Sequence, residues 1–137
     1  FAEWTLGMGH DLTICHPEGY ELDSEFTQGA RITHDQSEGL QNADFVYVKN
    51  WSAFNEYGKI LCSDPAWMVT MDKMKRTNNA KFMHCLPVRR NVVVDDAVLD
   101  SDHSIVIQQA GNRVWAAQTV LKEILLTQMR VESPYLF

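Results

Sequence analysis

The sequence predicts an α/β fold with three α/β/α layers, in which helices cover both faces of a central parallel sheet. Short apolar segments alternate along the chain with segments of helical periodicity, and strands that alternate with helices pair in parallel. The 137 residues are 45% hydrophobic and 22% charged, as expected of one domain with a single core. We therefore treat the chain as one domain.

Five segments are predicted to be strands, because they are short and rich in β-branched, aromatic or other apolar residues. They are residues 12–15, 31–33, 44–49, 81–86 and 104–108. Two helices are predicted between them. Asp35 is a suitable N-cap for a helix over 35–41, and Asp64 caps a helix over 65–75 that has Pro65 in its first turn.

The longest helix is predicted over residues 112–129, because apolar side chains recur there on one face. They are Val114, Ala117, Val120, Leu121, Ile124 and Leu125. We expect this face to be core, or an interface with a part of the protein outside this chain. The first four residues, Phe-Ala-Glu-Trp, resemble the interior of a helix, which indicates a fragment of a longer protein.

Composition excludes several classes of function. The net charge is −6, and no basic stripe is present that would neutralise nucleic-acid phosphates. No apolar run approaches the roughly 20 residues that a membrane span needs. The cysteines number three and show no CxxC spacing, which argues against a disulfide framework and a structural zinc site. We expect a cytoplasmic protein that needs no metal or organic cofactor.

Parallel sheets bind ligands at the carboxyl ends of their strands. This rule draws attention to the polar loops after Val48, His84 and Ile107. The second loop, residues 84–91, reads His-Cys-Leu-Pro-Val-Arg-Arg-Asn. A bend at proline turns neighbouring carbonyls outward to accept hydrogen bonds from an NH2 group, and guanidinium groups grip carboxylates or phosphates. The simpler interpretation is a turn followed by solvated arginines.

This loop resembles the HCLPxRRN motif of the ornithine carbamoyltransferases, in the form found in their N-acylornithine branch. Other segments resemble the same branch, most closely its N-succinylornithine enzymes. They are residues 16–23 (His-Pro-Glu-Gly-Tyr-Glu-Leu-Asp), 43–51, 77–80 (Thr-Asn-Asn-Ala) and 82–83 (Phe-Met). The resemblance covers nearly the whole chain and implies the Rossmann-like, ornithine-side domain of a carbamoyltransferase, residues 1–137, with a C-terminal helix over 112–130.

The resemblance implies a role for eight residues. His84, Cys85, Leu86 and Arg113 are expected to take part in catalysis. Lys49, Trp51, Pro87 and Arg89 are expected to bind substrate. The carbonyls of Cys85 and Leu86 would accept from the carbamoyl NH2 group, Lys49 and Arg89 would bind carboxylates, and the motif implies a cis Leu86–Pro87 bond.

Lys49 separates this sequence from ordinary ornithine carbamoyltransferases. At this position those enzymes have a loop that begins with Asp and contains Ser-Met-Gly. The carboxylate of this Asp pairs with the α-ammonium of ornithine. A lysine repels an ammonium and attracts a carboxylate, which suits an acylated, uncharged α-amine. In the acetylornithine enzymes a lysine stands where this chain has Val93, so the succinyl substrate is favoured. A solvated lysine at a strand end is the simpler alternative.

Arg113 follows Ala-Gly-Asn near the start of the predicted last helix. A helix N-terminus suits an anion, and the matching arginine of the family helps to bind carbamoyl phosphate. The sequence departs from the family at Gly111, where an Ala or Glu is usual. A surface arginine is the alternative interpretation.

The implied reaction is carbamoyl transfer from carbamoyl phosphate to the δ-amine of an N-acylornithine, in arginine biosynthesis. The family's Ser-Thr-Arg-Thr-Arg segment, which binds phosphate, is absent from this chain. The family forms trimers whose sites also use a neighbouring subunit. We therefore expect the whole protein to be a homotrimer and this chain alone to be inactive.

Three alternatives remain open at this stage. The chain belongs either to such an enzyme, to an ordinary ornithine or aspartate carbamoyltransferase, or to a non-catalytic binding module of the same fold. The Lys49 loop argues against the ornithine enzyme, and His84-Cys85 in place of His-Pro argues against the aspartate enzyme. A dinucleotide-binding domain is disfavoured because no GxGxxG motif is present.

Overall fold

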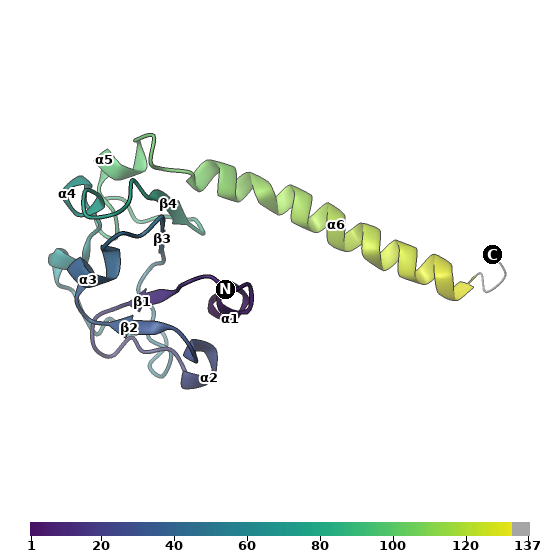
Figure 1. The fold of residues 1–137 in the computed structure, drawn as a ribbon, viewed down its shortest axis with the longest axis horizontal. Coiled ribbons are helices and arrows are strands. Elements are labelled where there is room, and N and C mark those ends of the chain that lie inside the picture. The colour runs from purple at the N-terminus through teal and green to yellow at the C-terminus, as the bar shows by residue number, and fades with distance from the viewer. Residues whose placement is uncertain (133–137) are drawn as a thin grey trace.

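The structure is a computed structural model that describes residues 1–132 (Figure 1). The elements in chain order are α1 (Ala2–Gly7), β1 (Thr13–Cys15), α2 (Ser24–Thr27), β2 (Arg31–Thr33), α3 (Gln36–Leu40), β3 (Phe45–Val48), the 3-10 helix η1 (Pro65–Trp67), α4 (Met71–Met74), β4 (Lys81–His84), α5 (Asp96–Leu99) and α6 (Val106–Glu132). The predicted alternation of strands and helices is confirmed.

The strands pair in parallel, as predicted, and form two pairs. In the first pair β1 lies beside β2, with Thr13 opposite Arg31. In the second pair β3 lies beside β4, and the register runs from Phe45 opposite Lys81 to Val48 opposite His84. Because β3 and β4 are parallel, their last residues, Val48 and His84, lie at the same edge of the sheet. The two loops that follow these residues therefore begin side by side.

The core surrounds β3 and β4 and is built from α3, α4, α5, the first turn of α6 and the chain between them. Its buried side chains are Leu40, Val46, Val69, Met74, Ala80, Phe82, Val93, Val94, Val98, Leu99 and Val106. Trp51 and Leu86, which belong to the two loops at the carboxyl edge, pack against this cluster. The core therefore fixes the positions at which the loops leave the sheet.

The predicted strand over residues 104–108 is wrong, because helix α6 already begins at Val106. Only Ser104 pairs like a strand residue, in a parallel bridge to Phe82. Val106 is 6% exposed and fills the core from the first turn of the helix. Burial of this side chain in a helix outweighs the β-branched propensity of the segment. The polar loop expected after Ile107 does not exist.

The predicted helix over residues 65–75 is interrupted. Asp64 caps η1 by accepting a hydrogen bond from the Ala66 N–H at 2.8 Å, as predicted, but the chain becomes extended at Met68. The Val69 N–H then donates to the Val93 carbonyl at 3.0 Å, and the Val69 carbonyl accepts from Asp95. This pairing with a distant segment separates η1 from α4.

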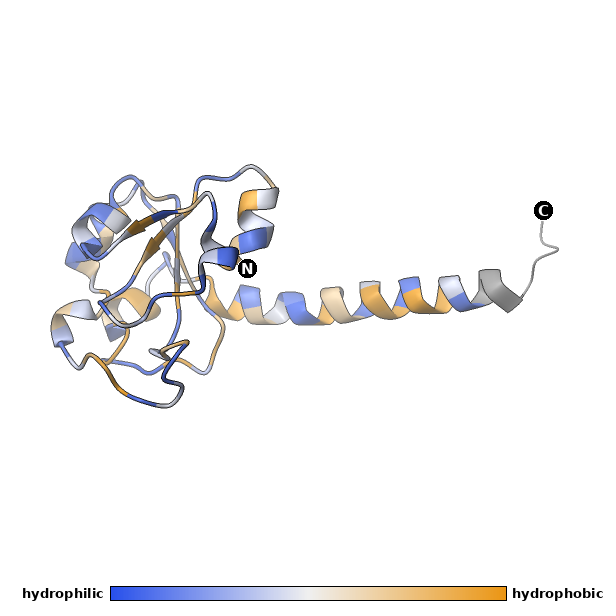
Figure 2. Ribbon diagram, turned by 90° about the horizontal axis from the view of Figure 1, so that it is seen from below, coloured by the Kyte–Doolittle hydropathy of each residue, from blue (hydrophilic) through white to orange (hydrophobic). Residues whose placement is uncertain are grey.

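Helix α6 projects away from the rest of the chain, with hydrophobic residues distributed along its length (Figure 2). The apolar face predicted as core or interface is exposed: Val114 is 57%, Leu121 57% and Leu125 50% exposed. This face is therefore not core within the described residues. None of the described helices is apolar enough over a sufficient length to cross a membrane.

Candidate functional site

Two loops meet at the carboxyl edge of β3 and β4. The loop after Val48 carries Asn50, whose side-chain Nδ2 donates a hydrogen bond to the Pro87 carbonyl at 3.1 Å. Pro87 belongs to the loop after His84, so this bond joins the two loops. The Asn50 Oδ1 atom is buried and has no hydrogen-bond partner among the described residues. The two segments singled out from the sequence are thus brought together.

His84 is the most deeply buried of the predicted catalytic residues, at 1% exposure. Its Nδ1 atom accepts a hydrogen bond from the Leu86 N–H at 3.0 Å. A neutral imidazole that accepts at Nδ1 carries its proton on Nε2. The Nε2 atom is buried and has no partner within the described part of the chain, so the ring holds one unused hydrogen-bond donor.

The charge state of His84 is set by its surroundings. Burial lowers the pKa of the imidazole below its usual value, and the positive charge of Lys49 lowers it further. Both effects disfavour the imidazolium. His84 is therefore neutral at pH 7, with Nε2–H as a donor. Lys49 itself is exposed at the end of β3.

The backbone of the His84 loop is held in an unusual conformation. The Leu86–Pro87 peptide bond is cis, which confirms the prediction. Leu86 has a φ of 49°, a value in the left-handed region that bulky L-residues rarely adopt. Strained positions of this kind gather at functional sites. The side chain of Leu86 packs against the core and helps to hold this conformation.

A pocket of about 290 Å³ opens beside His84. Its lining residues are His84, Cys85, Gln109, Ala110 and Arg113. The pocket unites three of the four predicted catalytic residues. The predicted position of Arg113 at a helix N-terminus is wrong, because α6 begins at Val106 and Arg113 lies about two turns inside it. Its guanidinium therefore acts through its own charge and not together with the helix terminus.

Arg89 and Arg90 are not equivalent. Arg90 forms ion pairs with Asp96 at 2.6 Å and with Asp100 at 2.6 Å, and it cannot grip a ligand while it holds both. Asp96 also accepts a hydrogen bond from the Asn91 side chain at 2.8 Å. Arg90 thus fastens the loop to α5. Arg89 is exposed and, like Lys49, is not among the residues that line the pocket.

Trp51 lies in an aromatic cluster beside the site. Its ring centroid is 5.4 Å from that of Tyr20 and 5.7 Å from that of Trp67. The Tyr20 hydroxyl accepts hydrogen bonds from the N–H groups of Leu61 and Cys62, at 2.9 and 3.2 Å. Trp51 and Tyr20 therefore hold the long loop after β3 against the domain. Trp51 is not among the pocket-lining residues.

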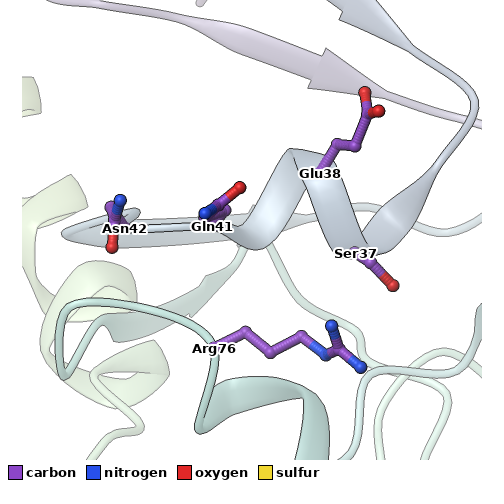
Figure 3. A pocket seen from close by; sticks show the side chains of 5 residues that line it. All are labelled: Ser37, Glu38, Gln41, Asn42 and Arg76. Atoms are coloured by element: carbon purple, nitrogen blue, oxygen red, sulfur yellow. The ribbon is translucent and has the colours of Figure 1, made fainter.

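A larger pocket, of about 380 Å³, lies at the opposite edge of the sheet (Figure 3). Ser37, Glu38, Gln41, Asn42 and Arg76 line it. Asn42 precedes β3 and Arg76 precedes β4, so this pocket is at the amino ends of the strands. Because open α/β sheets bind ligands at the carboxyl ends, we take the smaller pocket as the candidate site.

Gln109 and Ala110 line the site but were not predicted from the sequence. The Gln109 Oε1 atom accepts a hydrogen bond from the His84 N–H at 2.9 Å. The sequence prediction placed both residues in a loop between a strand over 104–108 and a helix from residue 112, whereas they lie in the first turns of α6. A helical spacing of 106, 109, 110 and 113 would have placed them on one face with Arg113.

The chain matches the family described as aspartate/ornithine carbamoyltransferase, Asp/Orn binding domain, over residues 2–124. It is 50% identical over 127 residues to the N-succinylornithine carbamoyltransferase of Bacteroides fragilis (strain 638R), covering 91% of this chain and 40% of that protein. It is 34% identical over 132 residues to the N-acetylornithine carbamoyltransferase of Xylella fastidiosa (strain Temecula1), covering 83% of this chain and 39% of that protein.

The fold is also similar to solved structures. A crystal structure of acetylornithine transcarbamylase complexed with acetylcitrulline superposes with a TM-score of 0.70 at 35% identity, covering 80% of this chain and 38% of that one. A mutant N-acetyl-L-ornithine transcarbamylase complexed with carbamyl phosphate and N-succinyl-L-norvaline superposes with a TM-score of 0.69 and the same coverage. The chain spans about two fifths of the length of the curated relatives it matches.

Proposed function

The chain belongs to the aspartate/ornithine carbamoyltransferase family, and from this premise we propose that the whole protein carbamoylates an N-acylornithine. Carbamoyl phosphate is the donor, and the δ-amine of the acylated ornithine is the acceptor. The product is an N-acylcitrulline on the route to arginine. N-succinylornithine is the favoured acceptor, because the chain is 50% identical to a succinylornithine enzyme and 34% identical to an acetylornithine enzyme.

The observation that carries this proposal is the buried Nε2–H of His84, which has no partner within the described residues and lies in a pocket lined by Cys85 and Arg113. A buried donor without a partner is costly, and a ligand carbonyl oxygen would satisfy it. We assign Nε2–H to the carbonyl oxygen of the carbamoyl group. The guanidinium of Arg113 faces the same carbonyl or the phosphate beside it.

The proposed step is a direct transfer without a covalent enzyme intermediate. The lone pair of the neutral δ-amine attacks the carbamoyl carbon, the carbonyl oxygen takes up negative charge, and the bond from carbon to the phosphate oxygen then breaks. As the carbonyl re-forms, the attacking nitrogen passes one proton to the departing phosphate. His84 and Arg113 stabilise the charge on oxygen, while the carbonyls of Cys85 and Leu86 hold the carbamoyl NH2 group.

Lys49 and Arg89 are assigned to the carboxylates of the acylated amino acid, and Trp51 and Pro87 to the walls beside it. Lys49 influences the charge of His84, so its ammonium is near enough to act on an anion in the same site. The whole protein is proposed to be a cytoplasmic homotrimer. The three cysteines are free thiols in the structure, which suits a reducing compartment. This chain alone is proposed to be inactive.

The test is formation of N-succinylcitrulline by the full-length protein, supplied with carbamoyl phosphate and N-succinylornithine. His84→Asn places a polar atom near the former position of Nδ1 and none near that of Nε2. His84→Gln places an amide group near the former position of Nε2. We expect His84→Asn to lower kcat by roughly 10²-fold or more, as for the loss of one donor to a developing oxyanion, and His84→Gln to lower it less. Equal activity of wild type and His84→Asn would overturn the assignment.

A further inference from the structure

A side-chain hydrogen bond joins the first turns of α6 to the end of β4. Gln109 Oε1 accepts the His84 N–H at 2.9 Å, and Gln109 also lines the pocket with His84 and Cys85. Because β4 ends at His84, the bond fixes the backbone at the point where the loop leaves the sheet. His84 cannot shift along the strand direction without breaking it.

We propose that Gln109 is a positioning residue for carbamoyl transfer. Its Oε1 atom holds the His84 backbone at the end of β4 and thereby fixes the placement of the His84 ring beside the pocket that both residues line. This inference rests on the proposed function, because it assigns Gln109 to the same reaction.

The test uses the full-length enzyme with two variants. Gln109→Met keeps the length of the side chain and removes the hydrogen bond to the His84 N–H. Gln109→Glu keeps an oxygen that can accept from that N–H. The matched control is Gln108→Met, because Gln108 is the neighbouring residue on α6 and is exposed.

We expect Gln109→Met to lower kcat roughly tenfold, as for one lost hydrogen bond, with the KM for N-succinylornithine unchanged within about twofold. Such a split marks an interaction that acts in the transition state. Gln109→Glu should restore part of the lost kcat and fall between Gln109→Met and wild type. Gln108→Met should behave as wild type.

A Gln109→Met enzyme with wild-type kcat would overturn this inference. So would a loss of kcat in Gln108→Met equal to that in Gln109→Met. A loss in Gln109→Met that disappears at assay temperatures well below its lowered midpoint of thermal unfolding would overturn it too. If the wild-type protein carbamoylates no amino acid, the proposed function fails instead. The two failures are therefore distinguishable in the same experiment.

Discussion

At the residue scale, Lys49 is the residue that we propose to select the charge of the substrate. It stands at the carboxyl end of β3, and its positive charge contributes to the lowered pKa of His84. An α-ammonium brought to this position would meet a like charge, whereas a succinyl carboxylate would meet an opposite one. The electrostatics of one residue thus favour an acylated substrate.

The first prediction concerns this residue. In the full-length protein, Lys49→Ala should weaken binding of N-succinyl-L-norvaline, measured by calorimetry at saturating carbamoyl phosphate, by about 1.5–3 kcal/mol for the lost charged contact. Binding of carbamoyl phosphate alone should change little. Lys75→Ala is the control, because Lys75 pairs with Asp72 at 2.7 Å on the surface of α4. Equal losses for both ligands would remove Lys49 from the amino-acid site.

At the element scale, α3 packs against β1 closely enough to exclude any side chain at Gly39. A Cβ atom there would lie 2.8 Å from the Cys15 Cβ and 2.9 Å from its Sγ. Burial raises the pKa of the Cys15 thiol to about 11, so this thiol is neutral at pH 7. The contact is therefore between an apolar thiol and the backbone of the helix.

Gly39→Ala should accordingly lower the free energy of unfolding by about 1–3 kcal/mol, the usual cost of overpacking, measured by urea denaturation. The matched control is Gly111→Ala in α6, where an added Cβ meets no atom within 4 Å. There the gain in helix propensity should stabilise the helix by about 0.5–1 kcal/mol. Similar effects at both positions would mean that α3 is not held tightly against β1.

Arg90 gives a prediction about pH. Its guanidinium lowers the pKa values of Asp96 and Asp100 below the usual range, mainly through hydrogen bonds. A carboxyl whose pKa is lowered in the folded state stabilises the fold at pH values above its pKa in the unfolded chain, about 3.9. This contribution is lost as the pH falls through the lowered pKa. The wild-type protein should therefore lose stability as the pH falls below about 4.

Arg90→Ala should lose less of its thermal stability over the same interval, because the largest cause of both lowered pKa values is then absent. Thermal unfolding midpoints of both proteins, measured from pH 6 downward, provide the check. Because these groups are exposed, the effect should shrink in high salt. Parallel pH curves for the two proteins would contradict this account of the ion pairs between the loop and α5.

The elements also show what the sequence can and cannot predict. The strands near residues 12–15, 31–33, 44–49 and 81–86 were predicted because each short segment is rich in β-branched, aromatic or other apolar residues. The segment from Ser104 was predicted wrongly, because its β-branched residues fit a strand and only the tertiary position of Val106, 6% exposed, makes it a helix.

The candidate site was predictable to a similar degree. The family motif supplied His84 and Cys85, and Arg113 was found although its helix was placed too late. The role of Arg90 was not predictable, because its partners Asp96 and Asp100 lie on an element whose orientation no local pattern gives. Gln109 was missed for the same reason as the start of α6.

At the scale of the whole molecule, α6 presents an apolar face that no described residue covers. Val120 is 60% exposed, Leu121 57% and Ile124 51%, and Figure 2 shows hydrophobic residues along the projecting helix. Apolar surface of this extent is typical of an interface. The chain spans about two fifths of the curated relatives it matches, so the activity proposed here belongs to the whole protein.

The central claim is that the whole protein acts on an N-acylated ornithine, and a substrate comparison tests it most directly. The full-length protein would be assayed at saturating carbamoyl phosphate with N-succinylornithine, N-acetylornithine and free ornithine in turn. A site built for one polar group can reject a substrate without its match by roughly 10⁴-fold. We predict the highest kcat/KM for N-succinylornithine and almost no turnover of free ornithine. Carbamoylation of free ornithine as efficient as that of its N-acyl derivatives would contradict this account and place the chain with the ordinary ornithine carbamoyltransferases.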